Sequence, residues 1–458
     1  MVVGKKNLRY YYWLMLEFAK KHNKLIFLSF LVSVITIVSI ITISPYISST
    51  LVRKKRVIGL IGSYRPRAFQ ELPDDIILKI SSGLTVVNDN GVVLPMLAST
   101  WDHSKDGKIY TFKIKKNILL NDGTLFTAKH ISLSFPDVTM KVIDDYTIEF
   151  HLKSPLAIFP LYLTKPVIIY PYTGVAGLYS VERVKQKNDF IEEISLSPNR
   201  KDAPPITYVF FSSEGEMITA YKLGKINEMT ISNMTMSDAF STWKNTSVTK
   251  NVDYTRLLTL FYNQKNPSLK EKDFRNAIES SFDYNKYSSY GVPATSSIPP
   301  TSWAYNSDLK KRETDIDFAK KTFKRFITAT ESAKMTLLTS YDYLDIADTV
   351  SGDLRDAGLP INVSVVPTLT SQPNFDFILA YVKIPSDPDQ YYYWHSTQNF
   401  AQLLSYQNLK IDKLLEDGRS TYKVSERKTA YSDMQRVMTD DPPGLFLFYP
   451  YNYLVKRK

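Results

Sequence analysis

Four residues near the C-terminal end of the chain have side chains suited to holding a small organic ligand. Tyr381 and Trp394 offer aromatic faces that can stack on flat groups, while Asp387 and Asp389 offer carboxylates that can pair with an ammonium group. We expect these four residues to contact a ligand. The alternative is structural: Tyr391–Trp394 would pack in a core, and Asp387, which precedes a proline, would cap a turn.

Groups that could make or break a covalent bond are scarce. The sequence has no P-loop, no Gly-x-Ser-x-Gly elbow and no His-Glu-x-x-His motif. It has no cysteine and only five, scattered histidines, so we expect no catalytic residue, no metal site and no cofactor. His395 beside Trp394 could act as a general base, but a hydrogen-bonded histidine near a pocket is the commoner case. The adjacent acids Asp144–Asp145 and Asp440–Asp441 are typical of solvated turns.

Strand and helix patterns are interspersed along the part of the chain that must position these residues. Strands are predicted where β-branched and aromatic residues alternate or run together, at 57–62, Lys108–Lys115, Tyr146–Leu152 and Ile206–Phe211. Helices are predicted where apolar residues recur every three or four positions, at Phe274–Phe282, Ile346–Ala357, Ile411–Gly418 and Ser425–Met438. In the last of these, Arg427, Lys428 and Arg436 are expected on the polar side. The fold class is therefore α/β or α+β.

An uncharged segment lies near the N-terminus. Leu25–Val52 carries no charge, and its first twenty residues, Leu25–Ser44, are rich in Ile, Val, Leu and Phe. A helix of about 20 such residues crosses a hydrocarbon layer of roughly 30 Å. We therefore predict a transmembrane anchor at 25–46, preceded by a basic and aromatic cytoplasmic segment at 1–24. The alternatives are a core helix, which normally shows a polar stripe, and a cleavable signal peptide, which normally has a shorter apolar run.

Most of the net positive charge surrounds this uncharged segment. Residues 1–56 contain ten basic residues and one acid, so +9 of the total net charge of +11 lies there and the rest of the chain is nearly neutral. Six of these basic residues precede the segment and four follow it, which favours a cytoplasmic N-terminus and a body outside the membrane. A nearly neutral body gives no sign of a basic face, so we expect no nucleic-acid partner.

Several segments together resemble the family 5 extracellular solute-binding proteins, the peptide-binding subunits of ABC importers. The segment Gly83–Phe135 resembles the family's signature at Gly91, Pro95, Leu97, Ala98, Trp101, Asp106, Gly107, Tyr110, Phe112, Asp122, Gly123, Thr127, Ala128 and Phe135. Further motifs of the family are matched by Val142–Leu152, Phe261–Asp283 and Ser386–Arg419. The resemblance therefore covers roughly residues 57–458.

The resemblance implies an α/β, periplasmic-binding-protein-like fold of class II, in which two lobes close on a ligand at their interface. Lobe I would consist of residues 57–262 and 445–458, with an extra subdomain at about 84–160, and lobe II of residues 263–444. Oligopeptides would be held largely through main-chain hydrogen bonds, which tolerate varied side chains. The loaded protein would then dock on the permease of an ABC transporter, and the N-terminal helix would keep it at the lipid bilayer.

The sequence departs from the family at two points that bear on function. Some peptide-binding members carry an aspartate, a few residues before an Asp-Pro pair, that takes the amino terminus of the peptide. Ile384 occupies that position when AYVKIPSDP is aligned on that segment. The chain also has no lipobox cysteine, so a helical tether would replace a lipid anchor. Three alternatives remain: another solute such as an oligosaccharide, a surface-anchored hydrolase, and a scaffold without a solute.

Overall fold

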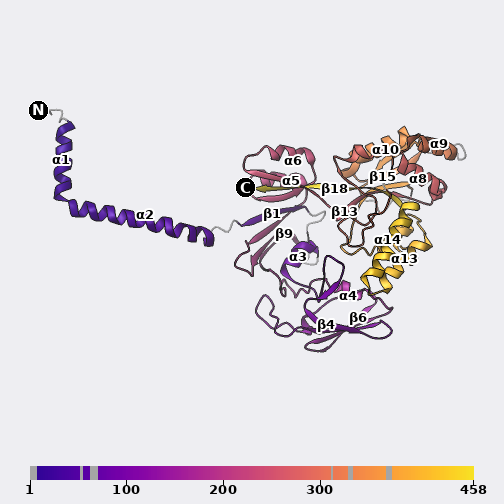
Figure 1. Cartoon of the computed structure of the whole chain (residues 1–458), viewed down its shortest axis with the longest axis horizontal. Coiled ribbons are helices and arrows are strands. Elements are labelled where there is room, and N and C mark those ends of the chain that lie inside the picture. Colours follow the sequence, from indigo (N-terminus) through magenta and orange to yellow (C-terminus); the bar gives the residue numbers. More distant parts are fainter. Residues whose placement is uncertain are drawn as a thin grey trace.

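A computed structural model describes residues 8–51, 55–61, 66, 71–310, 313–327, 334–367 and 374–458. Helices α1 (Leu8–Lys21) and α2 (Asn23–Leu51) lie apart from the rest of the chain, which forms a body of helices and sheets (Figure 1). Among the described residues, no single helix meets the length and apolarity needed to cross a bilayer. The pair Tyr11–Lys21 and Asn23–Ser39 meets them jointly, with a bend of 82° between its members. The transmembrane anchor at 25–46 therefore stays a prediction.

Within the described residues, the body is built on a twelve-stranded sheet in the order β16-β15-β17-β13-β18-β11-β1-β10-β9-β8, with β12 and β14 also paired to β18. We call its first group of strands the β1 side: β1 (Arg56–Ile61), β8 (Tyr179–Lys187), β9 (Phe190–Pro198), β10 (Ile206–Phe211), β11 (Glu228–Ile231) and β12 (Thr246–Val252). We call the second group the β15 side: β13 (Arg256–Tyr262), β14 (Gly291–Pro293), β15 (Met335–Thr339), β16 (Ile361–Val365) and β17 (Phe377–Lys383).

One long strand, β18 (Gly444–Arg457), joins the two sides of the sheet. Its first half pairs antiparallel with β13 and β14, and its second half pairs antiparallel with β11 and β12. The change of partner falls at Pro450, which lies opposite Gly291 of β14 and is followed by Tyr451 opposite Val252 of β12. The boundaries expected for lobes I and II stay predictions, and this change of partner is the structural feature nearest to them.

The β15 side is covered by helices on both faces because its central strands are apolar on both faces. In β13, Leu258 and Leu260 face one core while Leu257 and Phe261 face the other, and all four are buried. Such strands are typical of sheets enclosed between helical layers. The helices of this side are α7 (Pro267–Lys270), α8 (Lys272–Ser280), α9 (Ile316–Ile327), α10 (Leu344–Asp356), α11 (Tyr391–Trp394), α12 (Asn399–Leu403), α13 (Leu409–Ser420) and α14 (Val424–Asp440).

The β1 side has its own pair of cores, flanked by α3 (Asp74–Ile80), α5 (Glu214–Lys222) and α6 (Met234–Ser241). Strand β10 alternates between them, with Tyr208 and Phe210 facing one core and Val209 facing the other. Gly59 in β1 lies directly under α5, since a Cβ there would come within 2.9 Å of Met217 Cγ. The missing side chain therefore lets α5 pack close to the sheet.

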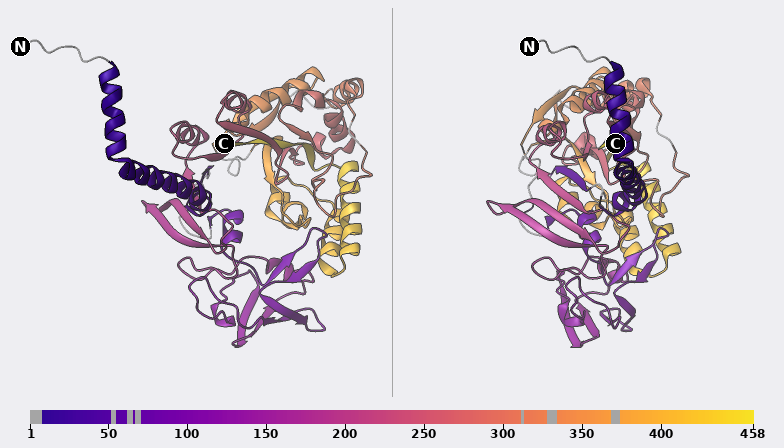
Figure 2. Two further views of the ribbon diagram at one scale, coloured as in Figure 1. Left: turned by 60° about the vertical axis from the view of Figure 1, so that its left-hand side comes forward. Right: turned by 90° about the vertical axis from the view of Figure 1, so that its left-hand side faces the viewer.

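A small sheet in the order β4-β5-β7-β6 forms a separate core beside the large one. Tyr110, Phe112 and Ile114 of β5 are all buried, which follows from their alternate spacing along the strand. Figure 2 shows this sheet below the large sheet, next to the ends of α13 and α14. Its elements are β4 (Ala98–His103), β5 (Ile109–Ile114), β6 (Val138–Asp144) and β7 (Thr147–Leu152), with the hairpin β2 (Thr85–Val87) and β3 (Val93–Pro95) and the short helix α4 (Phe159–Tyr162) nearby.

All eight strands and helices predicted from the sequence pattern are confirmed, with ends within two residues of those expected. One side-chain orientation was wrong. Arg427 was expected on the polar side of its helix, but it is 3% exposed, whereas Lys428 and Arg436 are exposed as expected. Arg427 shares the buried face of α14 with Tyr431 and Met434, at spacings of four and three residues.

Two glycines provide a matched test of how tightly this fold is packed. A Cβ at Gly177 would lie 2.0 Å from the Ile80 carbonyl oxygen, whereas a Cβ at Gly352 in α10 would meet open space. We expect Gly177→Ala to lower the free energy of unfolding by about 1–3 kcal/mol, because backbone atoms must shift. We expect Gly352→Ala to raise it by about 0.5–1 kcal/mol through helix propensity. Urea titrations of both variants check this, and equal effects would contradict the packing around Gly177.

Candidate ligand-binding site

The four residues expected to contact a ligand lie on and after β17, but they do not line one common pocket. Tyr381 belongs to β17, Asp387 and Asp389 lie in the loop that follows, and Trp394 ends α11. The two aspartates are close to each other, since the Asp389 backbone N–H donates to Asp387 Oδ1 at 3.0 Å. Tyr381 and Trp394 belong to the two different cores of the β15 side. Ligand contact by any of the four stays a prediction.

Tyr381 packs beside the core that α8, α9 and α10 cover. Its ring lies 5.1 Å from the ring of Tyr343 in a perpendicular arrangement, and the Arg256 guanidinium lies 5.1 Å from its centroid. Burial raises the pKa of the Tyr381 hydroxyl, so the group stays protonated at neutral pH. Half-buried between an aromatic ring and a cation, this side chain has an amphipathic setting that also suits a ligand contact.

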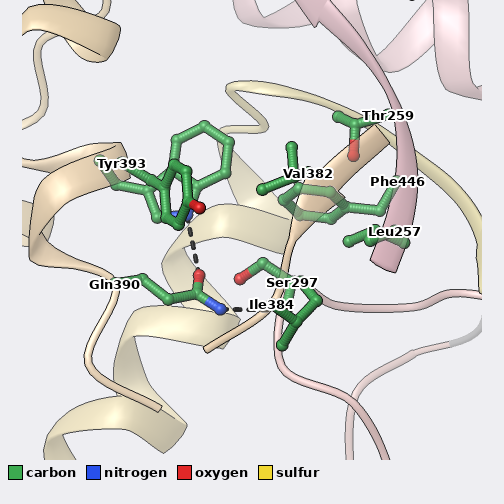
Figure 3. Close-up of a pocket in the computed structure, with 9 residues that line it drawn as sticks. Leu257, Thr259, Ser297, Val382, Ile384, Gln390, Tyr393 and Phe446 are labelled. Carbon is green, nitrogen blue, oxygen red and sulfur yellow. Dashed lines mark hydrogen bonds between the residues drawn. The ribbon is translucent and has the colours of Figure 1, made fainter. Parts of the chain in front are cut away.

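Trp394 is a core residue in this structure, with 2% of its surface exposed. Its indole Nε1 donates to Gln390 Oε1 at 2.8 Å, and its ring packs near Phe446 and Phe261. This arrangement matches the structural alternative considered for Tyr391–Trp394. Gln390 in turn donates to the Ser297 carbonyl at 2.8 Å, which fixes the loop against a neighbouring segment (Figure 3).

A small cavity lies beside Trp394 and is too small for an organic solute. Its volume is about 10 Å³, room for about one water molecule, and Ile384, Val382 and Phe446 are among its lining residues (Figure 3). Thr259 also lines it, and its Oγ1 has no hydrogen-bond partner in the described structure. Ile384 is 7% exposed and therefore fills an apolar wall at the position where some family members carry an aspartate.

Asp387 forms a buried ion pair with Arg427, whose Nη2 lies 2.6 Å from Asp387 Oδ1. Arg427 also donates to the Gly418 carbonyl at 3.1 Å and to the Tyr431 hydroxyl at 3.2 Å. The second carboxylate oxygen, Asp387 Oδ2, is buried and has no hydrogen-bond partner among the described residues. Burial therefore raises the pKa of Asp387, although the Arg427 charge opposes this shift. Asp387 both caps the turn and carries a buried charge.

Asp389 forms a second ion pair, with Arg419 of α13, that reaches across to α4. Arg419 Nε donates to both oxygens of Asp389, at 3.1 and 2.9 Å, and its guanidinium lies 3.9 Å from the Tyr391 ring centroid. Arg419 Nη2 also donates to the Tyr162 hydroxyl at 3.2 Å, and this hydroxyl donates to Asp389 Oδ2 at 3.4 Å. Tyr162 ends α4, whose first residue, Phe159, belongs to the core of the small sheet, so this cluster connects two separately built parts of the body.

Two further contacts join the small-sheet region to the β15 side. The Tyr422 hydroxyl lies 2.9 Å from the Tyr110 hydroxyl, and its ring stacks on His103 at 4.7 Å with an angle of 9°. In the β2–β3 hairpin, Gly91 has a φ of +77° and lies so close to Trp303 that a Cβ there would come within 2.4 Å of the indole. We call Tyr162, Tyr422 and Trp303, with their partners described above, the closing contacts.

Other residues singled out in the sequence have structural partners. Asp441 pairs with Arg275 and accepts from Asn408 Nδ2 at 2.9 Å, while Asp145 pairs with Lys129 at 2.7 Å. His395 lies 2.8 Å from the Thr397 hydroxyl. Each of these side chains is thus engaged in local stabilisation.

Sequence reasoning missed the residues that hold the two aspartates and the closing contacts. The spacing of Arg427 to Ala430, Tyr431 and Met434 follows the apolar face of α14, so helix periodicity could have found its burial. Tyr162, Arg419 and Tyr422 carry no comparable local signal, because their partners are hundreds of residues away or belong to another core.

The buried Asp387–Arg427 pair yields a prediction for stability. Arg427→Met and Asp387→Asn should each lower the free energy of unfolding by about 3–5 kcal/mol, because each leaves one buried polar partner unpaired, whereas the double variant should recover much of that loss. Urea titrations of the three variants give the coupling energy. Lys428→Met, an exposed neighbour, should change stability by less than about 0.5 kcal/mol. Additive effects of the two single changes would contradict a direct pair.

The variant Arg427→Met also yields a prediction for how the free energy of unfolding depends on pH. A carboxyl whose pKa is raised on folding contributes stability that is present below its unfolded pKa of about 3.9 and is lost as the pH rises through the folded pKa. Without Arg427, the opposing charge is gone and burial alone acts on Asp387. The loss of stability in Arg427→Met should therefore be smaller in acid than at neutral pH. A loss that does not change with pH, measured against Arg427→Met/Asp387→Asn, would contradict this.

The sequence is similar to two peptide-binding proteins over most of its length. The probable D,D-dipeptide-binding periplasmic protein DdpA of Escherichia coli is 23% identical over 415 residues, which cover 79% of this chain and 80% of DdpA. The oligopeptide-binding protein AppA of Bacillus subtilis is 23% identical over 423 residues, which cover 83% of this chain and 72% of AppA.

Solved structures share the fold of this chain. NikZ from Campylobacter jejuni, in complex with Ni(L-His), superposes with a TM-score of 0.70 and 21% identity, over 88% of this chain and 94% of NikZ. AppA from Bacillus subtilis, in complex with a nonapeptide, superposes with a TM-score of 0.66 and 21% identity over the same shares of the two chains. The α/β fold of periplasmic binding proteins, expected from the sequence motifs, is thereby confirmed.

A family model described as bacterial extracellular solute-binding proteins, family 5 Middle, matches residues 130–402. This match covers more than half of the chain and includes β17, the two aspartates and α11. The chain therefore belongs to the family 5 bacterial extracellular solute-binding proteins.

Proposed function

We propose that this protein captures oligopeptides between two lobes outside the membrane and delivers them to an ABC permease. The observation that carries the proposal is the nature of the closing contacts. Tyr162 contacts Arg419 and Asp389 through its hydroxyl group, and Tyr422 contacts Tyr110 through its hydroxyl group and stacks on His103. Water can replace the partners of both hydroxyl groups when the parts separate. A hydrogen bond between neutral groups contributes only about 0.5–1.5 kcal/mol, and one to a charged group about 1.5–3 kcal/mol, so these few bonds are within the range that the binding of a ligand can outweigh. A ligand that favours the closed arrangement would then shift the population toward it.

The choice of peptides as ligands is supported by DdpA and AppA, whose names describe peptide binding. The apolar wall at Ile384 is consistent with a peptide held by its main chain, without a carboxylate for its amino terminus at that position. In the buried pairs, Arg419 and Arg427 already neutralise Asp389 and Asp387. We therefore infer that ligand affinity arises chiefly from neutral hydrogen bonds and aromatic packing.

A second candidate is a metal chelate or another small solute. NikZ, solved with Ni(L-His), superposes with the higher TM-score of the two structures described, 0.70 against 0.66. A chelate of this size would need a smaller cleft than a nonapeptide. This candidate shares the two-lobe mechanism and differs in the ligand alone, so it is tested with the same protein.

We infer that α2 holds the body at the membrane, with the N-terminus in the cytoplasm. From Leu25 to Val38 the apolar side chains of this helix are largely exposed, for example Phe27 at 68% and Phe30 at 67%. An apolar helix surrounded by water on all sides is unfavourable, and a bilayer would cover that surface. The basic residues Lys20, Lys21 and Lys24 before the apolar stretch favour their own side as the cytoplasmic one.

The ligand itself can be identified from the full chain purified in detergent. We expect native mass spectrometry to show the protein with bound mixed peptides of several lengths, released on denaturation. A nickel–histidine complex, or a single sugar, would replace the peptide assignment by the corresponding solute. A protein that carries no ligand and binds neither a peptide library nor Ni(L-His) would contradict solute capture. Turnover of peptides or esters would instead support a hydrolase.

The closing contacts yield a prediction for affinity. Tyr162→Phe and Tyr422→Phe remove hydroxyl bonds made between the two parts while leaving the rings in place. Tyr422→Phe should weaken ligand binding by about two- to tenfold, because it removes about 0.5–1.5 kcal/mol from the closed state, and Tyr162→Phe by about tenfold or more, because its partners are charged. Tyr170→Phe, at a side chain that is 92% exposed, is the matched control. Calorimetric titration of the three variants measures the effect, and equal affinities throughout would contradict a role for these hydroxyls in closure.

A further inference from the structure

One end of the β1 side collects the strand ends nearest to α2. Strands β1 and β10 run parallel and begin together, with Arg56 opposite Ile206, and β11 begins two residues farther along β1. Strand β18 runs the other way and ends there, with Lys456 opposite Glu228. Strand β12 begins at the same end, with Thr246 opposite Arg457. In Figure 1, the C-terminus and the start of β1 lie on the side of the body that α2 approaches.

Backbone hydrogen bonds fix this end of the sheet as one rigid edge. The Asn227 side chain donates to the Lys55 carbonyl at 2.9 Å, and the Arg457 backbone N–H donates to the Asn227 carbonyl at 2.9 Å. The Lys458 backbone N–H donates to the Asn245 carbonyl at 3.0 Å. Segments from four distant parts of the sequence are therefore held together at this edge.

Five exposed lysines project from this edge, and we call them the basic edge: Lys55, Lys222, Lys225, Lys244 and Lys456. The structure gives none of these five an ion pair within the described residues. Two carboxylates at this end are paired with arginines and not with these lysines: Glu228 with Arg56 at 2.6 Å, and Asp202 with Arg200 at 3.7 Å. Leu223, between two of the lysines, is 67% exposed.

The opposite end of the same strands carries charges of both signs, since Lys187 ends β8 there and lies near Ser212. Glu214 and Glu216 begin α5, just after β10 ends, whereas Lys222 ends this helix at the basic edge. The nearly neutral net charge of the body therefore does not reveal the local group of lysines at one end of the strands, which the sheet topology brings together. A surface with several like charges in fixed positions attracts a surface of opposite charge.

We propose that the basic edge binds the anionic phospholipid headgroups of the bilayer that α2 enters. The inference rests on the anchoring part of the proposed function. Arg56 follows Leu51, the last residue of α2, by five positions, so the start of β1 at this edge cannot lie more than roughly 18 Å from the end of that helix. Lysines within about a Debye length of an anionic surface, ~10 Å, are attracted to it, and an exposed leucine among them can enter the interface.

A lipid surface fits the basic edge better than nucleic acid does. The lysines are spread across the ends of a sheet, whereas recognition of a duplex usually places a helix or a β-ribbon in a groove. The short connection to α2 also brings a bilayer to this edge in every molecule that is anchored. Binding there would orient the β1 side with its strands directed away from the membrane.

Because the chain has no native cysteine, the proposal can be tested with a single label on the full chain. Ser247→Cys, at an exposed position beside the edge, carries an environment-sensitive fluorophore, and the protein is reconstituted in nanodiscs whose lipids bear a headgroup quencher. We expect strong quenching when phosphatidylglycerol is mixed into phosphatidylcholine and weak quenching in phosphatidylcholine alone. Lys225→Glu/Lys244→Glu/Lys456→Glu should lower the docked fraction by about tenfold or more. Added salt should act in the same direction.

A matched control carries the same change in net charge at exposed lysines of the β15 side, Lys320→Glu/Lys321→Glu/Lys410→Glu, and should keep the wild-type quenching. Equal loss in both triple variants, or quenching independent of phosphatidylglycerol, would overturn the proposal. Binding of a short DNA duplex at the edge without any dependence on headgroup charge would also overturn it. Release of the chain from membranes by alkaline carbonate would contradict the proposal that α2 anchors the protein in the bilayer. In that case, quenching of the labelled protein by added vesicles of the same lipids tests lipid binding by the basic edge independently of the anchor, and absence of quenching would overturn it.

Discussion

The pairing of β13 with β18 at the centre of the twelve-stranded sheet is the constraint on which the rest of the body depends. Leu445 to Tyr449 of β18 are at most 1% exposed, as are Leu257, Leu258 and Leu260 of β13. These residues contribute to both cores of the β15 side, so burial of apolar area fixes the register between the strands. The C-terminal half of β18 then carries this fixed position over to β11 and β12. The loop that bears Asp387 and Asp389 is positioned by β17, which pairs with β13 along its whole length.

Two arginines, the buried Arg427 and the partly buried Arg419, then determine what the loop can do. Arg427 and Arg419 neutralise the two aspartates, and each also contacts aromatic rings, Tyr431 and Tyr391 respectively. Removing such charges from water is costly unless they are paired and hydrogen-bonded, which explains why both guanidinium groups have several acceptors. A loop held in this way is rigid. The contacts between this loop and Tyr162 of the small-sheet region are hydroxyl bonds and are easier to break. A rigid loop with separable outer contacts is what movement of two rigid bodies would require.

Local sequence patterns predicted the strands and helices well because burial repeats along a single element. The alternation in β5 and the three- and four-residue spacing in α10 arise from residues that are adjacent in sequence. The family and the α/β fold were also predicted, because several motifs fall in order over most of the chain. The closing contacts were not predicted, since Tyr110 and Tyr422 are 312 positions apart and neither belongs to a periodic pattern. The basic edge was not predicted for a related reason. Its lysines come from four segments that only the sheet topology brings close together.

Pro450 interrupts the backbone hydrogen bonding of the central strand, β18. Proline has no backbone N–H, so it leaves a gap in the hydrogen-bond ladder at the place where β18 passes from one set of neighbours to the other. Bending at this position would break one backbone hydrogen bond fewer than bending at a residue that has its N–H in the ladder, and the carbonyl of Pro450 still accepts from the Asp253 backbone N–H at 2.8 Å. A twelve-stranded sheet with an unbroken hydrogen-bond ladder would resist bending. The missing N–H of Pro450 gives the β1 side and the β15 side a position at which one could turn relative to the other with little loss of hydrogen bonds.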